Sequence, residues 1–316
     1  MQRLRLLSRL REAQVPSSSV KECLLSSLEE EGLVFEENGL VSIKADAGKV
    51  FSIELRRLAA GIAVSDLMGH ILRYDRFPRA PGWEDQLSRT IEKMKGGDGK
   101  VYGIVIASLT GEDIPEFPVS PALVIPPSMA EARSEMARSK TLSSCLFLSW
   151  SDSFDASFLS DKGLIHLPQI GHIRVSREGK CRCGGTGCLN AVASVRYLKE
   201  RTGERSTRAL FKETPALRQA LQATAFALSL AVQTLGAERI IITGGMSGME
   251  DSSYVILNET LSLLLPPGRQ HVKANRAAAG EKGLREGAAE TALDAFFYHT
   301  DILSQLSLIE SQTGKP

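Results

Sequence analysis

The sequence predicts an α/β protein whose parallel or mixed sheet is covered by helices. Strand-like and helix-like segments alternate from Val50 onward, which is the pattern of such folds. Residues 239–245, RIIITGG, read as a buried strand that runs into a glycine turn. Thr214 and Pro215 begin a long helix in the usual order of cap and proline, and Gly236 ends it.

The first 48 residues predict two helices and then a β-hairpin. Leucines at positions 4, 7 and 10 follow a helical spacing, and Pro16 would end that helix. Residues 19–22 have the pattern of a capping box, so a second helix is expected to start there. Asn38-Gly39 between two apolar runs predicts the hairpin turn. The apolar face of the second helix is expected to contain Val20, Cys23, Leu24 and Leu28.

This N-terminal segment has two interpretations. It looks like the second half of a winged helix-turn-helix, or it is a small capping subdomain with no ligand. DNA binding depends on basic side chains that reach phosphates, and the equally plausible alternative for such arginines is a solvated helix face. The candidates for DNA contact are Arg3, Arg5, Arg9, Arg11 and Lys21.

Further strands are expected in residues 50–63, 101–107 and 146–150, and a final helix in residues 283–297. A glycine-rich turn at residues 96–99 would join a helix to the second of these strands.

The composition favours a globular protein of the cytoplasm. Hydrophobic residues make up 43% of the chain and charged residues 24%, as in an ordinary soluble domain. A net charge of +1 excludes a basic surface over the whole molecule. We expect no signal peptide and no membrane contact, because the longest apolar run falls far short of the ~20 residues of a membrane span.

A histidine and three cysteines lie within 17 residues: His172, Cys181, Cys183 and Cys188. Zn²⁺ prefers four such nitrogen and sulfur ligands, and the glycines between Cys183 and Cys188 allow the chain to fold back. Four protein ligands leave no open position, so the predicted zinc is structural. The alternatives are four unrelated loop residues or a redox Cys-x-Cys pair, which leaves His172 and Cys188 unexplained.

Residues 171–194, GHIRVSREGKCRCGGTGCLNAVAS, resemble the signature of the ROK family (repressor, open reading frame, kinase). In that signature Gly-His is followed by Cys-x-Cys-Gly-x-x-Gly-Cys-x-Glu. The segments VFSIELRRLAAGIAVSDLMGHIL, AERIIITGGMS and GLREGAAETAL are similar to further parts of the family.

The resemblance implies a two-lobed actin-like sugar-kinase fold in residues 49–316, with a zinc-binding insert at 171–190. A shortened winged-helix-like segment at 1–48 precedes it. The partners it implies are DNA, a small carbohydrate-like effector and a second copy of the chain in a homodimer.

The phosphate-binding motifs of the family are altered. Where its kinases have Asp-x-Gly-Gly-Thr, this chain has residues 54–58, ELRRL, and bulky side chains replace the glycines that let phosphate approach the backbone. The second phosphate loop aligns with residues 152–158, DSFDASF. We expect its phenylalanines to block a nucleotide and its aspartates to repel one.

The catalytic positions are altered as well. The aspartate that serves as general base in the family aligns with Pro127, which cannot accept a proton. The sugar-binding glutamate aligns with Gln169, and the glutamate after the last cysteine aligns with Asn190. Gly244 and Gly245 keep the pattern of the nucleotide-side turn. These four residues are the candidate ligand-binding positions, and no residue is expected to be catalytic.

The resulting hypothesis is a non-catalytic ROK-type transcriptional regulator or sensor. The alternative is a scaffold or ligand sensor that does not bind DNA. An active sugar kinase is a third possibility, which phosphoryl transfer from ATP to a sugar would establish.

Overall fold

The computed structural model describes residues 2–96, 99–109, 119–139 and 141–298. Residues 97–98 of the expected turn and residues 299–316 of the expected body therefore lie outside the described residues. The chain divides into two compact units. Unit 1 comprises Met1–Ile125 and Ala288–Pro316, and unit 2 comprises Pro126–Gly287.

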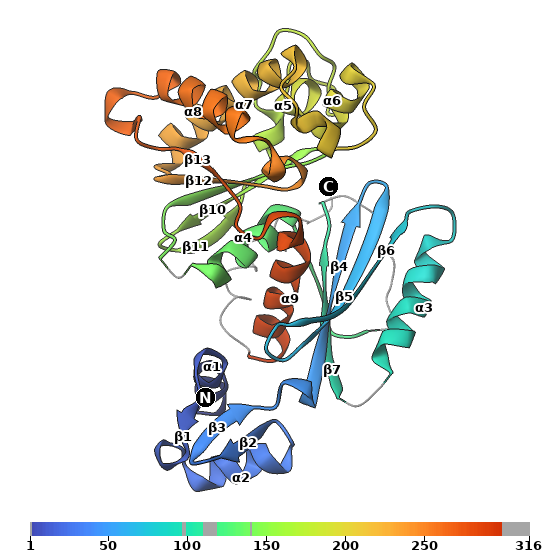
Figure 1. Cartoon of the computed structure of the whole chain (residues 1–316), viewed down its shortest axis with the longest axis vertical. Coiled ribbons are helices and arrows are strands. Elements are labelled where there is room, and N and C mark those ends of the chain that lie inside the picture. The colour runs from blue at the N-terminus through green and yellow to red at the C-terminus, as the bar shows by residue number, and fades with distance from the viewer. Residues whose placement is uncertain (1, 97–98, 110–118, 140, 299–316) are drawn as a thin grey trace. The chain divides into compact units, whose positions relative to one another are not determined.

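The N-terminal segment of unit 1 combines two helices with a small antiparallel sheet (Figure 1). The sheet order is β1-β3-β2, so the first strand pairs with the last. Asn38 and Gly39 have positive φ values of 54° and 78°, which confirms the predicted hairpin turn. The elements are α1 (Gln2–Glu12), β1 (Val15–Pro16), η1 (Ser17–Ser19), α2 (Glu22–Glu30), β2 (Val34–Glu37) and β3 (Leu40–Ile43).

The predicted start of the second helix is wrong, and its predicted apolar face is wrong at Cys23 but confirmed at Leu28. Lys21 occupies the N-cap of α2 without a side-chain cap, and the Ser19 hydroxyl donates to the Pro16 carbonyl at 2.7 Å. The helix buries Leu25 and Leu28, whereas Cys23 is exposed and not a core residue. Cys23 precedes Leu25 by two positions, or about 200° of helical rotation, so it points to solvent.

The five-stranded sheet of unit 1 has the order β6-β5-β4-β7-β8, in which β7 and β8 run parallel to β4 and β7 respectively. Residues 50–63 thus form parts of two strands, because the chain turns at Arg57-Leu58 and returns antiparallel. The strands are β4 (Gly48–Arg56), β5 (Ala59–Asp66), β6 (Ile71–Pro78), β7 (Lys100–Ala107) and β8 (Ala122–Ile125).

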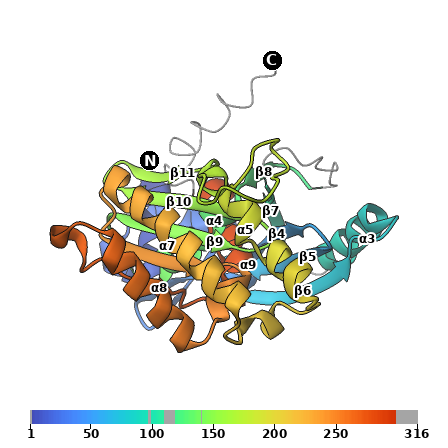
Figure 2. The same ribbon diagram turned by 90° about the horizontal axis from the view of Figure 1, so that it is seen from above.

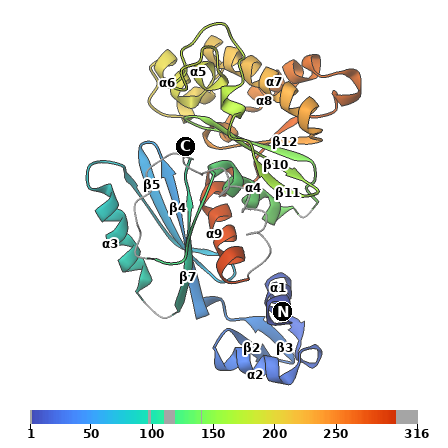
Figure 3. The same cartoon turned by 180° about the vertical axis from the view of Figure 1, so that it is seen from behind.

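Two helices cover opposite faces of this sheet (Figure 3). On one face α3 (Trp83–Lys95) packs on strand residues such as Phe51 and Ile53. On the other face lies α9 (Gly283–Phe296), and Phe296 occupies the space beside Gly103, where any side chain would overlap its ring.

Lys49 of β4 binds the C-terminal end of α3. Its ammonium group is buried and donates to the carbonyls of Met94, Lys95 and Gly96 at 3.4, 2.9 and 3.1 Å. A helix end leaves such carbonyls without partners, and a cation there also complements the helix dipole.

Replacing Lys49 with methionine is therefore expected to lower the free energy of unfolding by about 1–3 kcal/mol, because buried carbonyls lose their donor. Urea denaturation would measure the change. Lys93→Met, on the exposed side of the same helix, is the matched control. Equal effects of the two substitutions would contradict the capping role.

Unit 2 has a second five-stranded sheet, with the order β11-β10-β9-β12-β13. Seen from above, α7 and α8 lie side by side across it (Figure 2). The Thr214 hydroxyl accepts from the Leu217 amide at 3.1 Å, and Gly236 has φ 70°, so both predicted ends of α7 are confirmed.

The strands of unit 2 are β9 (Cys145–Trp150), β10 (Phe154–Ser160), β11 (Gly163–His166), β12 (Arg239–Thr243) and β13 (Ala274–Arg276). Its helices are α4 (Pro127–Arg138), α5 (Leu189–Val192), α6 (Val195–Thr202), α7 (Pro215–Leu235) and α8 (Asp251–Leu264).

Among the described residues, no helix combines the length and the apolar character needed to cross a membrane.

Candidate metal centre and ligand-binding positions

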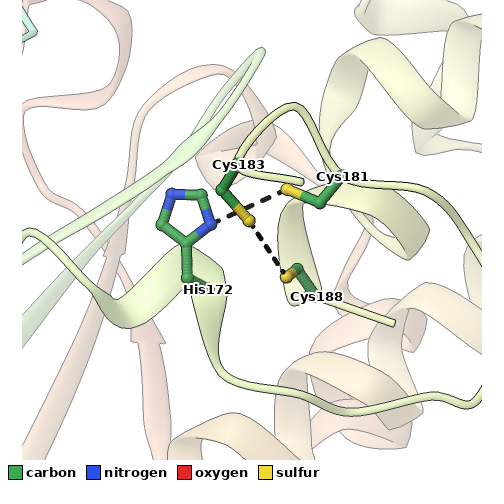
Figure 4. Close-up of side chains that lie close together, drawn as sticks. All are labelled: His172, Cys181, Cys183 and Cys188. Carbon is green, nitrogen blue, oxygen red and sulfur yellow. Dashed lines mark hydrogen bonds between the residues drawn. The ribbon is translucent and has the colours of Figure 1, made fainter. Parts of the chain in front are cut away.

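The four predicted metal ligands converge in unit 2 (Figure 4). Their potential ligand atoms all lie within 4.8 Å of one another. The Cys181 Sγ is 3.7 Å from the His172 Nδ1, and the Cys183 Sγ is 3.7 Å from the Cys188 Sγ. A tetrahedron with bonds of about 2.3 Å has edges near 3.8 Å, so this spacing suits Zn²⁺.

Backbone hydrogen bonds hold the loop that carries these ligands. The amides of Val175 and Ser176 both donate to the Gly187 carbonyl, at 2.8 and 3.1 Å. Gly187 has φ 76°, and any side chain there would overlap the Ser176 carbonyl. Glycine is thus required at this point, because the chain folds back on itself there.

Both ends of the loop are anchored in the fold. His172 ends the short helix η3 (Ile170–His172), and Cys188 is the N-cap of α5. The buried residues Ile170 and Leu189 on either side belong to the core of unit 2. The ligands are therefore presented from fixed positions.

The two cysteines of the close pair differ in acidity. The pKa of the Cys183 thiol is lowered, chiefly because the Gly185 amide donates a hydrogen bond to it. A hydrogen bond with the Cys181 side chain lowers this pKa further. Burial raises the pKa of Cys188 to about 12. A coordinated cation would deprotonate these thiols, so metal binding and proton release are linked at this site. Three thiolates and an imidazole complete a closed shell, which suits a structural ion and leaves no place for reactive water.

The candidate ligand-binding residues next to the metal site have different environments. Gln169 is exposed at the N-cap of η3. Asn190 is half-buried, and its Oδ1 accepts the Phe154 amide at 2.7 Å. Its side chain also fills the space beside Gly171, where a Cβ would overlap it. Asn190 thus has a structural contact, whereas the Gln169 amide faces solvent.

Gly244 and Gly245 form a tight turn after β12. Gly244 has φ 76°, and a Cβ there would lie 3.0 Å from the backbone nitrogen and oxygen of Trp150. The Gly245 amide donates to the Ser151 hydroxyl at 3.1 Å. Close packing within unit 2 accounts for glycine at position 244 without a nucleotide.

A buried polar cluster lies at the start of α4, beside the position of the family's catalytic base. Pro127 is the first residue of the helix. The Asp155 carboxylate accepts the Ser128 amide at 3.0 Å and contacts the His166 Nε2 at 2.6 Å. The Ser128 and Ser157 hydroxyls are hydrogen-bonded at 2.7 Å. An acidic side chain is favourable at a helix N-terminus, so Asp155 caps α4.

Sequence reasoning missed this cluster and gave His166 no role. Alternation along β10 places Asp155 and Ser157 on one face, and His166 pairs with Ser157 on the neighbouring strand. The register of β10 and β11 would have predicted this cluster, but the register is known only from the structure.

The expectation that the phenylalanines of residues 152–158 block a nucleotide is wrong. Phe154 and Phe158 lie in the hydrophobic core of unit 2 and do not project from a loop. The expected repulsion by Asp155 is also wrong in its mechanism, since this carboxylate is buried against α4 and His166. The reason is that residues 154–160 continue a strand, and its alternating side chains point into the core.

The first phosphate hairpin carries a buried carboxylate. Glu54 accepts hydrogen bonds from the Tyr74 hydroxyl and, at 3.4 Å, from Arg56 Nη2. It lies opposite Gly61, where any side chain would overlap it. The turn itself consists of Arg57 and Leu58, both exposed. Tyr74 and Arg56 thus bind the Glu54 carboxylate, and the turn carries the side chains of Arg57 and Leu58 where the family's kinases have glycine and threonine.

Two of the five basic residues proposed for DNA contact have acidic partners within unit 1. Arg3 binds both carboxylate oxygens of Glu31, at 2.5 and 2.7 Å. Arg11 pairs with Glu290 and, at 2.6 Å, with Asp294 on α9. The remaining three, Arg5, Arg9 and Lys21, are exposed.

Residues 155–295 match the family model described as the ROK family. No curated protein matches the chain. Among solved structures, it is similar to a ROK family transcriptional regulator, a homolog of the E. coli MLC protein. The two are 17% identical with a TM-score of 0.67, over 89% of this chain and 90% of the other.

Two kinases share the fold. A ROK hexokinase from Thermus thermophilus is 19% identical with a TM-score of 0.59, over 78% of this chain and 99% of its own. A ROK family glucokinase from Streptomyces griseus, solved with glucose and AMPPNP, is 18% identical with a TM-score of 0.59, over 77% and 99%. These likenesses confirm the predicted α/β fold of the actin-like sugar kinases.

Proposed function

Because residues 155–295 form a ROK family domain, we propose that this chain is a non-catalytic regulator or sensor of the ROK type. The observation that carries the proposal is Pro127 in the first turn of α4, at the position that aligns with the family's general base. Proline has no group that could take a proton from a sugar hydroxyl.

The first phosphate hairpin supports the same conclusion. Phosphoryl transfer depends on backbone amides and metal ions that hold the transferred phosphate. Glu54 is instead bonded to Tyr74 and Arg56, and no glycine is present in the turn at residues 57–58. The kinase-like fold would then serve to bind an effector.

The remaining assignments follow from the site. His172, Cys181, Cys183 and Cys188 would hold a structural Zn²⁺ that fixes the loop at residues 171–190. A carbohydrate-like effector would contact Gln169 and Asn190, which donate and accept hydrogen bonds without charge. The nucleotide-side turn would be Gly244 and Gly245, and the active form would be a homodimer.

The match with the regulator supports a DNA-linked role. It spans 89% of this chain, whereas the two kinases, matched over 99% of their own lengths, span 77% and 78%. The kinases thus leave more than a fifth of this chain without a counterpart. The N-terminal segment, with exposed Arg5, Arg9 and Lys21, is the candidate for DNA binding.

A scaffold or ligand sensor without DNA binding is the second candidate. Residues 1–48 contain six basic and eight acidic residues, a net charge of −2. Ion pairs with Glu31, Glu290 and Asp294 also engage two of those basic residues. Such a segment has little excess charge to neutralise phosphates.

Binding to a fluorescent DNA fragment from the upstream region of its own gene separates the two candidates. Salt-sensitive binding that random DNA competes for poorly would support the regulator. Unchanged binding after Arg5→Gln with Arg9→Gln would place the contact outside α1. A lack of binding at low salt would favour the scaffold.

Purified protein is expected to show no ATP-dependent phosphorylation of glucose, N-acetylglucosamine or N-acetylmannosamine. Pro127→Asp alone is expected to remain inactive, because the Arg57-Leu58 turn still lacks the glycines for phosphate. A coupled assay that detects ADP would test both proteins, with a ROK glucokinase as the positive control. Turnover by the wild-type chain would refute the non-catalytic proposal, and turnover by the variant alone would show that the hairpin tolerates phosphate.

A further inference from the structure

The region that starts at the metal loop has a larger net positive charge than the whole chain. Between Arg174 and Arg218 there are eleven basic and four acidic residues, a net charge of +7. The whole chain has a net charge of only +1. A bound Zn²⁺ with three thiolates would contribute −1, which leaves a large surplus. This charge belongs to one part of unit 2 and not to the N-terminal segment.

The basic side chains of this region are exposed and largely without acidic partners. Of the four acidic residues, Glu200 pairs with Arg196 at 3.8 Å and Glu213 pairs with Arg218. Lys199 is half-buried, and the other eight basic residues form two exposed groups, for which the structure of residues 141–298 gives no ion pair. We call them the loop group (Arg174, Arg177, Lys180, Arg182) and the helix group (Arg201, Arg205, Arg208, Lys212).

Backbone bridges and helix contacts hold the backbone of both groups in place. Bridges between Arg174 and Cys188 and between Lys180 and Thr186 hold the loop group on the metal loop. The short helix α5 contacts both η3 and α6, and α6 in turn contacts η4 (Arg208–Phe211). Figure 2 shows α5 and α6 close together on the upper face of unit 2. The two groups therefore belong to one packed part of the unit.

The chemistry of this surface favours duplex nucleic acid over a protein partner or a single strand. The exposed large hydrophobic residues of unit 2, such as Phe226 and Leu230, lie outside residues 174–218. Protein interfaces depend on buried apolar and aromatic anchors, which this surface lacks. Single-stranded nucleic acid requires exposed aromatic side chains for base stacking, and Tyr197 and Phe211 are partly buried in the core.

We propose that the loop group and the helix group bind the phosphate backbone of duplex nucleic acid without reading its sequence. Arginine and lysine side chains neutralise phosphates and release the counterions condensed on a duplex. This contact does not require the N-terminal segment to bind DNA, and it goes beyond the proposed effector site. It would let unit 2 hold a duplex whose sequence another element reads.

The test uses the full-length zinc-loaded protein and a fluorescent duplex of random sequence. With four to six phosphate contacts, the Kd is expected to rise roughly 100- to 1000-fold between about 50 and 200 mM salt. Arg177→Glu with Arg182→Glu should raise the Kd at least ~10-fold at low salt and flatten its salt dependence. Arg205→Glu with Arg208→Glu, far from the ligands in sequence, should do the same.

Arg89→Glu with Lys93→Glu, two exposed residues of α3 in unit 1, is the charge-matched control, and it should leave binding to random duplex unchanged. Zinc content and circular dichroism of each variant establish that it is folded. A loss of binding in the control with none in the two unit 2 variants would overturn the proposal. So would binding to polyglutamate as tight as binding to the duplex, which would indicate an acidic protein partner. Kinase turnover would refute the proposed function but leave this test intact.

Discussion

Replacing Cys188 with serine is expected to abolish stoichiometric zinc binding and to lower the free energy of unfolding by roughly 4 kcal/mol or more. Cys188 is the buried member of the set and also the N-cap of α5, so its loss would affect both the ion and the core beside it. Metal analysis by mass spectrometry and thermal unfolding would measure the two effects.

Cys23→Ser is the matched control, because Cys23 is exposed and lies on α2 in unit 1. That variant should keep its zinc and its stability. A chelator strong enough to remove zinc from the wild type should reproduce the unfolding behaviour of the Cys188 variant. Wild-type protein purified without chelators that contained no zinc would contradict the expectation.

Replacing Arg11 with methionine is expected to lower the free energy of unfolding by about 3 kcal/mol, because the carboxylates on α9 lose their cation. The guanidinium pairs with Glu290 and Asp294, one helical turn apart, and lies 4.7 Å from the centre of the Tyr298 ring. The Asp294 side chain is almost fully buried, so its negative charge is more costly once the guanidinium of Arg11 is removed.

The same substitution should release the N-terminal segment from the rest of unit 1. Limited proteolysis would show faster cleavage near residues 44–48, and chemical denaturation would give the loss of stability. Arg9→Met on the exposed side of α1 is the control and should change neither quantity. Equal protease resistance of the two variants would contradict this anchoring role of Arg11.

Local signals in the sequence predicted the fold well where they depend on a few adjacent residues. The Asn38-Gly39 turn and both ends of α7 need only special backbone conformations or a neighbouring hydroxyl, and all are confirmed. The metal cluster was predictable for the same reason, since its ligands span 17 residues.

Predictions failed where the outcome depends on distant partners. The face of α2 follows from the strands it packs on, so Cys23 could not be placed from helical spacing alone. Phe154 looks like a loop residue until its strand is paired with β9. Arg11 contacts Glu290 and Asp294 on α9, which lie 279 and 283 residues further along the chain. No local pattern in either segment predicts this contact.

The composition of unit 1 has a consequence for the order in which the protein can fold during synthesis. Unit 2 is one continuous stretch, whereas unit 1 combines Met1–Ile125 with residues near the end of the chain. The ribosome therefore synthesises all of unit 2 before it adds Glu290 and Asp294, the partners of Arg11. Domains of multidomain chains generally fold from the N-terminus as they emerge. Here α1, which is made before unit 2, completes its contacts only after α9 has been made.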